Sequence, residues 1–285
     1  MAKTQDLKRR IRSVKNTRQL TKAMKMVSAA KLRRAQERIT AARPYAEKQR
    51  DVLQSLASRA EGEAHPLLVQ REVATTEIVA VSGDKGLCGA FNAQVLKEAH
   101  REYDAVAGGV ELMAIGKKSR DYFDHRNVPM RREMSDIFKN VDYSVADDIG
   151  NDLISRYVDG KVDRIVLVYN EVVSAIAAKP VVHQLLPVVA EAQDDDGGFT
   201  EDYIYEPDAQ ALFEALLPYY VKNQIFQALL ESEAGEHAMR MAAMDAATRN
   251  AGELIDKLTL TMNRVRQASI TTEIIEVVSG AQALG

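Results

Sequence analysis

The sequence has 285 residues, of which 46% are hydrophobic and 28% are charged, and it contains one cysteine, Cys88. This composition excludes collagen-like and wholly disordered chains, the single cysteine excludes an internal disulfide and fits a reducing cytoplasm, and no apolar run is long enough to cross a membrane. The net charge of −3 is the sum of two unlike parts, because residues 1–50 carry 16 Lys and Arg against three acidic residues and residues 51–285 carry 22 against 38.

Residues 1–60 predict one very long helix, or two helices joined near Pro44. They contain no glycine and are rich in Ala, Lys, Arg, Glu, Gln and Leu, which favour helix. Apolar or small residues recur at alternating spacings of three and four, which is the pattern of a coiled-coil seam. The first seam positions are Leu7, Ile11, Val14, Thr17, Leu20, Met24 and Val27.

The same helix carries a dense set of cations that acidic residues within it cannot neutralise. Such a basic helix can bind either nucleic acid or an acidic protein surface. Nucleic acid is the weaker alternative, because residues 1–44 contain no aromatic side chain that could stack on bases. The twelve cations are Lys8, Arg9, Arg10, Arg12, Lys15, Arg18, Lys22, Lys25, Lys31, Arg33, Arg34 and Arg38.

Residues 73–190 predict a small α/β domain with a mostly parallel, Rossmann-like sheet. Short β-branched runs alternate with helical segments, as βαβ units require. The predicted strands are residues 77–82, 110–115, 163–169 and 180–186. The predicted helices are residues 90–106, 116–125 and 144–159.

Within this domain the glycine-rich stretch 82–89 is the best candidate for a phosphate-binding loop. Its spacing fails, because Gly86 is followed by Leu87 and Cys88 rather than by Lys and Ser or Thr, and no G-x-G-x-x-G aligns. Cys88 has no nearby histidine and is expected to pack. The histidines show no metal-binding spacing, so the sequence predicts no catalytic residue, no cofactor and no metal site.

Residues 191–207 form a predicted acidic connector, and residues 208–285 a second very long helix. Asp208 is a suitable N-cap, and Pro218 is expected to kink or break the helix about ten residues in. Because the chain returns through the middle domain, the two terminal helices are expected to form an antiparallel coiled coil. The second seam runs through Leu212, Leu216, Tyr219, Asn223, Phe226, Leu230, His237, Met241, Met244, Thr248, Ala251, Ile255, Leu258, Met262, Val265 and Ser269.

The end of this helix is apolar over an arc of about 180°, wider than the roughly 100° stripe that packing on one partner needs. Part of that arc is therefore expected to contact another molecule. Glu273 and Glu276 occupy the complementary arc. The apolar residues are Ile270, Ile274, Ile275, Val277, Val278, Ala281 and Leu284.

Several stretches resemble the gamma-subunit family of F-type ATP synthases, and the resemblance covers the whole chain. The N-terminal helix contains IRSVKNT at 11–17 and LTKAMKMVSAAKL at 20–32. The middle contains GLCG at 86–89, and the connector contains YEP at 205–207. The final helix contains EHAMRMAAM at 236–244 and RQASITTEIIEVVSGA at 266–281.

The resemblance implies a non-catalytic rotor on the cytoplasmic face of the bacterial plasma membrane. Such a rotor turns inside the alpha and beta subunits and sits with epsilon on a membrane ring of c subunits. Ion flow turns the ring, and the shaft couples that rotation to ATP synthesis or hydrolysis. A basic coiled-coil nucleic-acid-binding protein and a nucleotide-binding α/β enzyme are the alternatives.

The resemblance also implies specific contact residues, carried over by matching position. Arg240, Gln267, Thr271 and Glu273 match residues that engage a beta-subunit loop. Met24, between Lys22 and Lys25, lies where the shaft passes the acidic lever segment of beta. The complete set of expected partner contacts is Lys22, Met24, Lys25, Arg240, Gln267, Thr271 and Glu273.

Overall fold

The computed structural model describes residues 2–57, 65–174, 177–188 and 209–282. The chain divides into two compact units, which we call the shaft unit (residues 1–29 and 240–285) and the α/β unit (residues 30–239). Each unit contains part of both terminal helices, α1 (Ala2–Ala57) and α5 (Ala209–Gln282). The predicted connector and N-cap Asp208 lie outside the described residues.

The two terminal helices are paired and antiparallel in each unit. In the shaft unit Thr21 Oγ1 lies 2.8 Å from Thr248 Oγ1, and Lys25 Nζ lies 2.6 Å from Asp245 Oδ1. The residue number rises along α1 as it falls along α5, so the helices run in opposite directions. In the α/β unit the same order holds for Arg38 with Glu233 and for Gln49 with Asn223.

Part of the predicted seam on α1 is wrong by one residue. Leu20 and Val27 are 61% and 57% exposed, whereas their neighbours Thr21 and Ser28 are only 8% and 3% exposed. Small hydroxyl side chains can face a partner helix when their oxygens are paired, as Thr21 is with Thr248. A seam that is located from the spacing of apolar residues misses positions at which threonine or serine faces the partner helix. Tyr219, a predicted seam residue of α5, is also exposed.

The prolines do not interrupt the helices. α1 continues through Pro44, so it is one helix, and α5 continues through Pro218 where a kink or break was expected. A proline inside a helix costs about 3 kcal/mol in isolation. On α5 the neighbours Leu217 and Val221 are fully buried. Burial of this face against the α/β domain offsets the loss and holds the helix together.

The chain between the two long helices forms a five-stranded sheet in the order β3-β2-β1-β4-β5. β1 is parallel to β2 and β4, and β2 is parallel to β3, so the predicted parallel sheet is confirmed. The last strand, β5, is antiparallel to β4. The strands are β1 (Thr75–Val81), β2 (Gly109–Ile115), β3 (Arg132–Met134), β4 (Arg164–Ser174) and β5 (Ala177–Leu186). The short strand β3 was not predicted.

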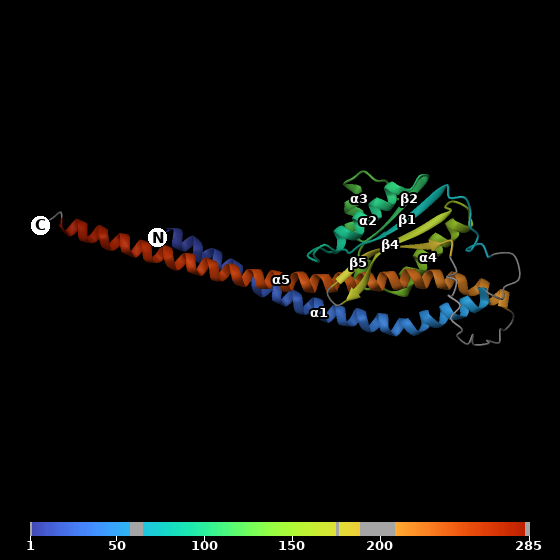
Figure 1. Cartoon of the computed structure of the whole chain (residues 1–285), viewed down its shortest axis with the longest axis horizontal. Coiled ribbons are helices and arrows are strands. Elements are labelled where there is room, and N and C mark those ends of the chain that lie inside the picture. The colour runs from blue at the N-terminus through green and yellow to red at the C-terminus, as the bar shows by residue number, and fades with distance from the viewer. Residues whose placement is uncertain (1, 58–64, 175–176, 189–208, 283–285) are drawn as a thin grey trace. The chain divides into compact units, whose positions relative to one another are not determined.

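Helices cover both faces of the sheet (Figure 1). One face packs on α2 and α3, through residues such as Val95, Leu96 and Phe123. The other face packs on α4 and on α5. The short elements are α2 (Phe91–Ala105), α3 (Lys117–Asp124), the 3-10 helix η1 (Ile137–Lys139) and α4 (Tyr143–Val158), and the three α-helices match their predicted ranges.

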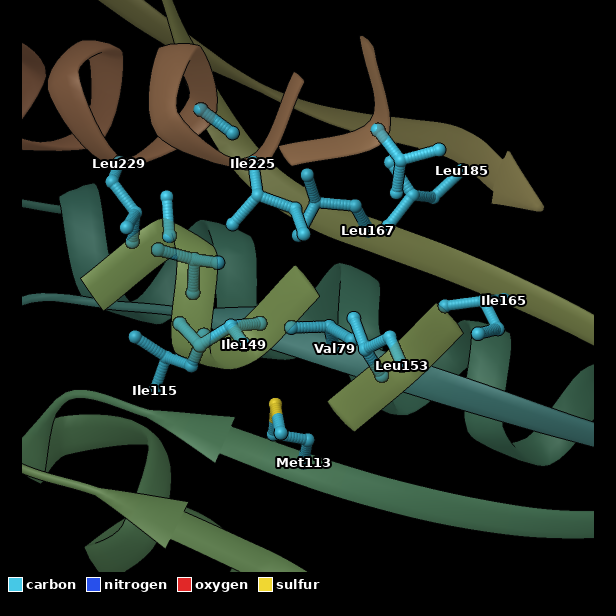
Figure 2. Close-up of a cluster of buried hydrophobic side chains, with 14 of the residues drawn as sticks. Val79, Met113, Ile115, Ile149, Leu153, Ile165, Leu167, Leu185, Ile225 and Leu229 are labelled. Carbon is cyan, nitrogen blue, oxygen red and sulfur yellow. The ribbon is translucent and has the colours of Figure 1, made fainter. Parts of the chain in front are cut away.

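The second of these cores joins the long helix α5 to the domain. Figure 2 shows Ile225 and Leu229 of α5 meeting Leu167 of β4 and Ile149 of α4 in one cluster of buried side chains. Because protein cores are close-packed, helix and sheet cannot slide past each other without opening voids. α5 is therefore an integral part of the α/β unit.

A buried network of charges links the sheet to α4 on this face. The fully buried carboxylate of Glu77 on β1 lies 2.5 Å from Arg131 Nη2 and 3.0 Å from Arg156 Nε. Arg131 also pairs with Asp152 at 2.7 Å, and Arg156 pairs with Glu111. Burial raises the pKa of Glu77, and the two guanidiniums oppose that rise. The two arginines therefore offset part of the cost of burying this carboxylate.

Glu231 on α5 is a less well satisfied carboxylate, and it yields a pH-dependent prediction. Its Oε1 accepts a hydrogen bond from Gln227, whereas the buried Oε2 has no hydrogen-bond partner among the described residues. Burial raises the pKa of Glu231, and nearby Glu171 adds to the rise. A carboxyl whose pKa is raised on folding favours the folded state at low pH, and this contribution is lost as the pH rises through the folded pKa.

We therefore expect Glu231→Gln to stabilise the chain by about 1 kcal/mol at pH 8 and to have little effect near pH 4. Urea unfolding at the two pH values measures the difference. Glu253→Gln, at an exposed position of the same helix, is the control. An equal effect of Glu231→Gln at both pH values would contradict the prediction.

Candidate partner-contact surfaces

The glycine-rich stretch 82–89 is occupied by contacts within the chain. The carboxylate of Asp84 accepts hydrogen bonds from the backbone N–H groups of Lys117 and Asp136, each at 2.9 Å, and of Phe138 at 3.3 Å. Lys117 is the first residue of α3, where a bound anion is favoured by the helix dipole. The carboxylate of Asp84 therefore satisfies backbone N–H groups at the start of α3 and around η1, and ties the loop to those elements.

Cys88 packs beside the same loop. Its side chain is buried, and Asn92 Nδ2 donates hydrogen bonds to Cys88 Sγ at 3.2 Å and to the Lys85 carbonyl at 3.1 Å. The Asn92 carbonyl oxygen accepts from the N–H of Gly83 at 2.9 Å. Asn92 thus fixes both ends of the loop, and Cys88 has the packing role expected from the sequence.

Gly83 brings this loop against α5, which gives a second prediction. A Cβ on Gly83 would lie 2.8 Å from the carboxylate of the buried Glu236. Gly83→Ala is therefore expected to destabilise the chain by about 1–3 kcal/mol through overpacking, as urea unfolding measures. Gly86→Ala is the matched control, because a Cβ there meets no atom within 4 Å. Similar losses for both substitutions would refute the assignment.

Neither a metal-binding cluster nor a membrane-spanning helix is found in the part of the chain that the structure describes. No group of three or more His, Cys, Asp or Glu side chains among the described residues is arranged to hold a metal ion. No helix among them is both long and apolar enough to cross a membrane. The candidate functional site is therefore taken from the contact residues that the sequence predicts on the two long helices.

All seven predicted contact residues lie in the shaft unit. Lys22 is exposed and Met24 and Lys25 are half-buried. Lys25 is held by Asp245 on α5, whose pKa is lowered chiefly by the hydrogen bond from Lys25. Sequence reasoning missed Asp245, and the antiparallel register is the signal that could have found it. Arg240 is buried, at 7% exposure, and lies little more than one turn from Asp245.

The remaining three predicted residues form a separate group on α5. Gln267, Thr271 and Glu273 are exposed, and they lie roughly 40–50 Å along the helix from Arg240 at about 1.5 Å per residue. Gln267 and Thr271 share one face, since Thr271 Oγ1 donates to the Gln267 carbonyl at 3.0 Å. Glu273 lies about 200° around the helix from Thr271. The chain therefore presents two contact stations rather than one cluster.

The end of α5, residues 270–282, which we call the tip, extends past the start of α1. The pairing of Thr21 with Thr248 places the first residues of α1 opposite about residue 267 of α5, because both helices rise equally per residue. Residues 270–279 are accordingly exposed on every side. Val277 is 71% exposed. Consecutive large apolar side chains in water mark an interaction surface.

Comparisons with known proteins give the family. Residues 3–284 match a family model described as ATP synthase. The ATP synthase gamma chain of Desulforamulus reducens is 49% identical over 284 residues, covering all of both chains. That of Pelotomaculum thermopropionicum is 45% identical over 285 residues, again covering both chains completely. The chain belongs to the ATP synthase gamma chain family.

A solved structure supports the same fold for this gamma chain. A chain from the mitochondrial ATP synthase of Euglena gracilis, in a structure of OSCP, F1 and c-ring in rotational state 3, superposes with a TM-score of 0.71. It is 19% identical, and the match covers 99% of this chain and 95% of that one. Membership of the gamma chain family makes this a non-catalytic stalk subunit, and the nucleic-acid-binding alternative finds no support.

Proposed function

We propose that this gamma chain is the rotating central-stalk subunit of an F-type ATP synthase. It couples ion flow through the membrane c ring to ATP synthesis, and in reverse to ATP hydrolysis, at the alpha and beta subunits. The observation that carries the proposal is the 49% identity to a gamma chain over the full length. The antiparallel pair of helices that ends in an exposed apolar tip supports the mechanical role.

The tip and the α/β unit suit different partners. The apolar tip fits a ring-shaped socket formed by alpha and beta subunits, because a socket contacts a helix on all sides. The α/β unit suits epsilon and the c ring. This assignment is supported by the Euglena gracilis relative, whose structure is of an assembly that includes a c-ring. We infer a peripheral location at the cytoplasmic face of the bacterial plasma membrane.

The basic side of α1 supplies the asymmetry that a rotor needs. A shaft shifts the nucleotide affinity of a beta subunit only if its contacts differ between the states of that subunit. Around the shaft at the height of Lys25, α1 presents the exposed cation Lys22, whereas α5 presents the carboxylate of Asp245, with which Lys25 pairs. Exposed charge pairs with an acidic lever are weak and screened by salt, so they can exchange as the shaft turns.

We also propose that Lys22, Met24 and Lys25 meet the acidic lever segment of beta, and that Gln267, Thr271 and Glu273 meet a beta-subunit loop. Arg240, also expected at that loop, lies too far along α5 to meet the same loop and belongs to the station of Lys22 and Lys25. The separation of the two stations along α5 supports contacts at two heights within the head. Arg240 is only 7% exposed, so it offers little surface to a partner.

Reconstitution tests the proposed function. Purified chain is mixed with alpha and beta subunits, and ATP hydrolysis is measured together with co-elution on gel filtration. We expect a stable complex whose hydrolysis exceeds that of the alpha and beta subunits without the chain, while the chain alone hydrolyses no ATP. Failure to co-elute with alpha and beta would exclude the proposal.

A further inference from the structure

Arg38 on α1 joins three parts of the α/β unit. Its Nη1 lies 3.0 Å from Glu233 Oε2 on α5, and its Nη2 donates a hydrogen bond to the carbonyl of Val141. Val141 directly precedes Asp142, which is the N-cap of α4. One guanidinium therefore connects α1, α5 and the beginning of α4.

The carboxylate of Glu233 depends on this contact. The Glu233 side chain is only 13% exposed, whereas that of Arg38 is 37% exposed. Burial raises the pKa of Glu233, and the charge of Arg38 opposes the rise. A hydrogen bond to a charged group changes an equilibrium by a factor of roughly 10 or more, and we take the lower end because Arg38 remains partly in water.

The position of Arg38 along α1 gives the contact a mechanical consequence. α1 runs to Ala57, and the chain then leads toward β1, so the covalent link to the domain lies at one end of the helix. Arg38 is about 28 Å along the helix from that end. A contact at this distance opposes pivoting of α1 about its covalent link far better than a contact beside the link.

We propose that Arg38 is a positioning residue that fastens α1 to α5 and to the start of α4, so that a turning force on the α/β domain reaches both shaft helices together. The part of this inference that concerns torque rests on the proposed function as a rotor. The planar fork of arginine is required, since it addresses two acceptors in fixed directions whereas lysine is a single point charge.

The test separates fastening from simple stability by comparing four variants of the full chain. Arg38→Ala removes both contacts and leaves Glu233 buried without its ion-pair partner. The double variant Arg38→Ala with Glu233→Gln also lacks both contacts but carries no unpaired charge. Arg38→Lys keeps the charge pair and loses the link to Val141. Arg33→Ala is the control, because Arg33 forms its ion pair with the exposed Glu37 one turn away on the same helix.

Two readouts are used for each variant. The first is the number of ions that the reconstituted complex pumps per ATP hydrolysed. The melting temperature of the same complex is measured alongside it. We expect the double variant and Arg38→Lys to melt near the wild-type temperature and still to pump fewer ions per ATP. The second is hydrogen exchange on the isolated chain, where amides of α1 around residue 38 are expected to exchange roughly tenfold faster.

The outcomes are distinguishable. A wild-type ion ratio and wild-type exchange in Arg38→Lys and the double variant would overturn the inference, as would an ion ratio that simply follows the melting temperature across all variants. If the wild-type complex itself fails to assemble or pump, the proposed function fails. Hydrogen exchange then still decides whether Arg38 fastens α1.

Discussion

Replacing Glu77 by alanine is expected to lower the free energy of unfolding of the α/β unit by about 3–5 kcal/mol, because it removes one partner of a buried ion pair and leaves the others charged. Two guanidiniums, of Arg131 and Arg156, converge on this fully buried carboxylate. In the variant, Asp152 and Glu111 still pair with Arg131 and Arg156, but neither replaces the carboxylate that Glu77 supplies from β1. Urea unfolding followed by circular dichroism measures the loss.

A surface pair provides the control for this prediction. Asp159→Asn breaks the pair of Asp159 with Lys161, whose side chains are both more than half exposed, and should change the free energy of unfolding by less than about 1 kcal/mol. If Glu77→Ala were no more damaging than Asp159→Asn, the charge network would not hold α4 to the sheet.

Replacing the large apolar residues of the tip by serine is expected to weaken assembly with alpha and beta subunits at least about 100-fold without changing the stability of the isolated chain. These side chains are exposed, so the fold gains little from them, whereas burying each in a socket is worth about 1.5–3 kcal/mol. Affinity for the alpha and beta subunits and the melting temperature are both measured. The residues replaced are Ile270, Ile274, Ile275, Val277 and Val278.

Substitutions elsewhere on the exposed part of α5 show whether the tip is special. Asp256→Ala and Thr261→Ala also alter exposed positions and should leave the affinity unchanged. An unchanged affinity in the serine variant would mean that the apolar tip is not what the head holds. A large fall in melting temperature would instead mean that the tip belongs to the fold.

The helices and strands could largely be predicted because their signals are local. The spacing of apolar residues along a helix and the short β-branched runs of the sheet depend only on nearby residues, and the structure confirms α2, α3, α4 and four of the five strands. β3 escaped prediction because three residues carry no period. Pro218 was misjudged because a local rule for proline ignores the burial of Leu217 and Val221.

For the contact residues too, some features could be predicted from the sequence and others could not. The apolar arc of the tip was visible in the sequence, since one helix turn repeats every 3.6 residues. Its exposure on all sides was not, because that follows from where α1 begins in the register with α5. Asp245, Asp84 and Glu233 carry no sequence signal of their own, since their roles depend on partners far away in the chain.

By itself the sequence determined that the chain has two long terminal helices of unlike charge around a parallel α/β domain, with no phosphate loop. The basic share of α1 remains its most distinctive feature. Only the tertiary structure decided which residues form the seam, which carboxylates form ion pairs with the cations of α1, and where α1 is fastened. Composition and periodicity record what each residue prefers, whereas pairing across more than 200 residues of sequence depends on the register that packing selects.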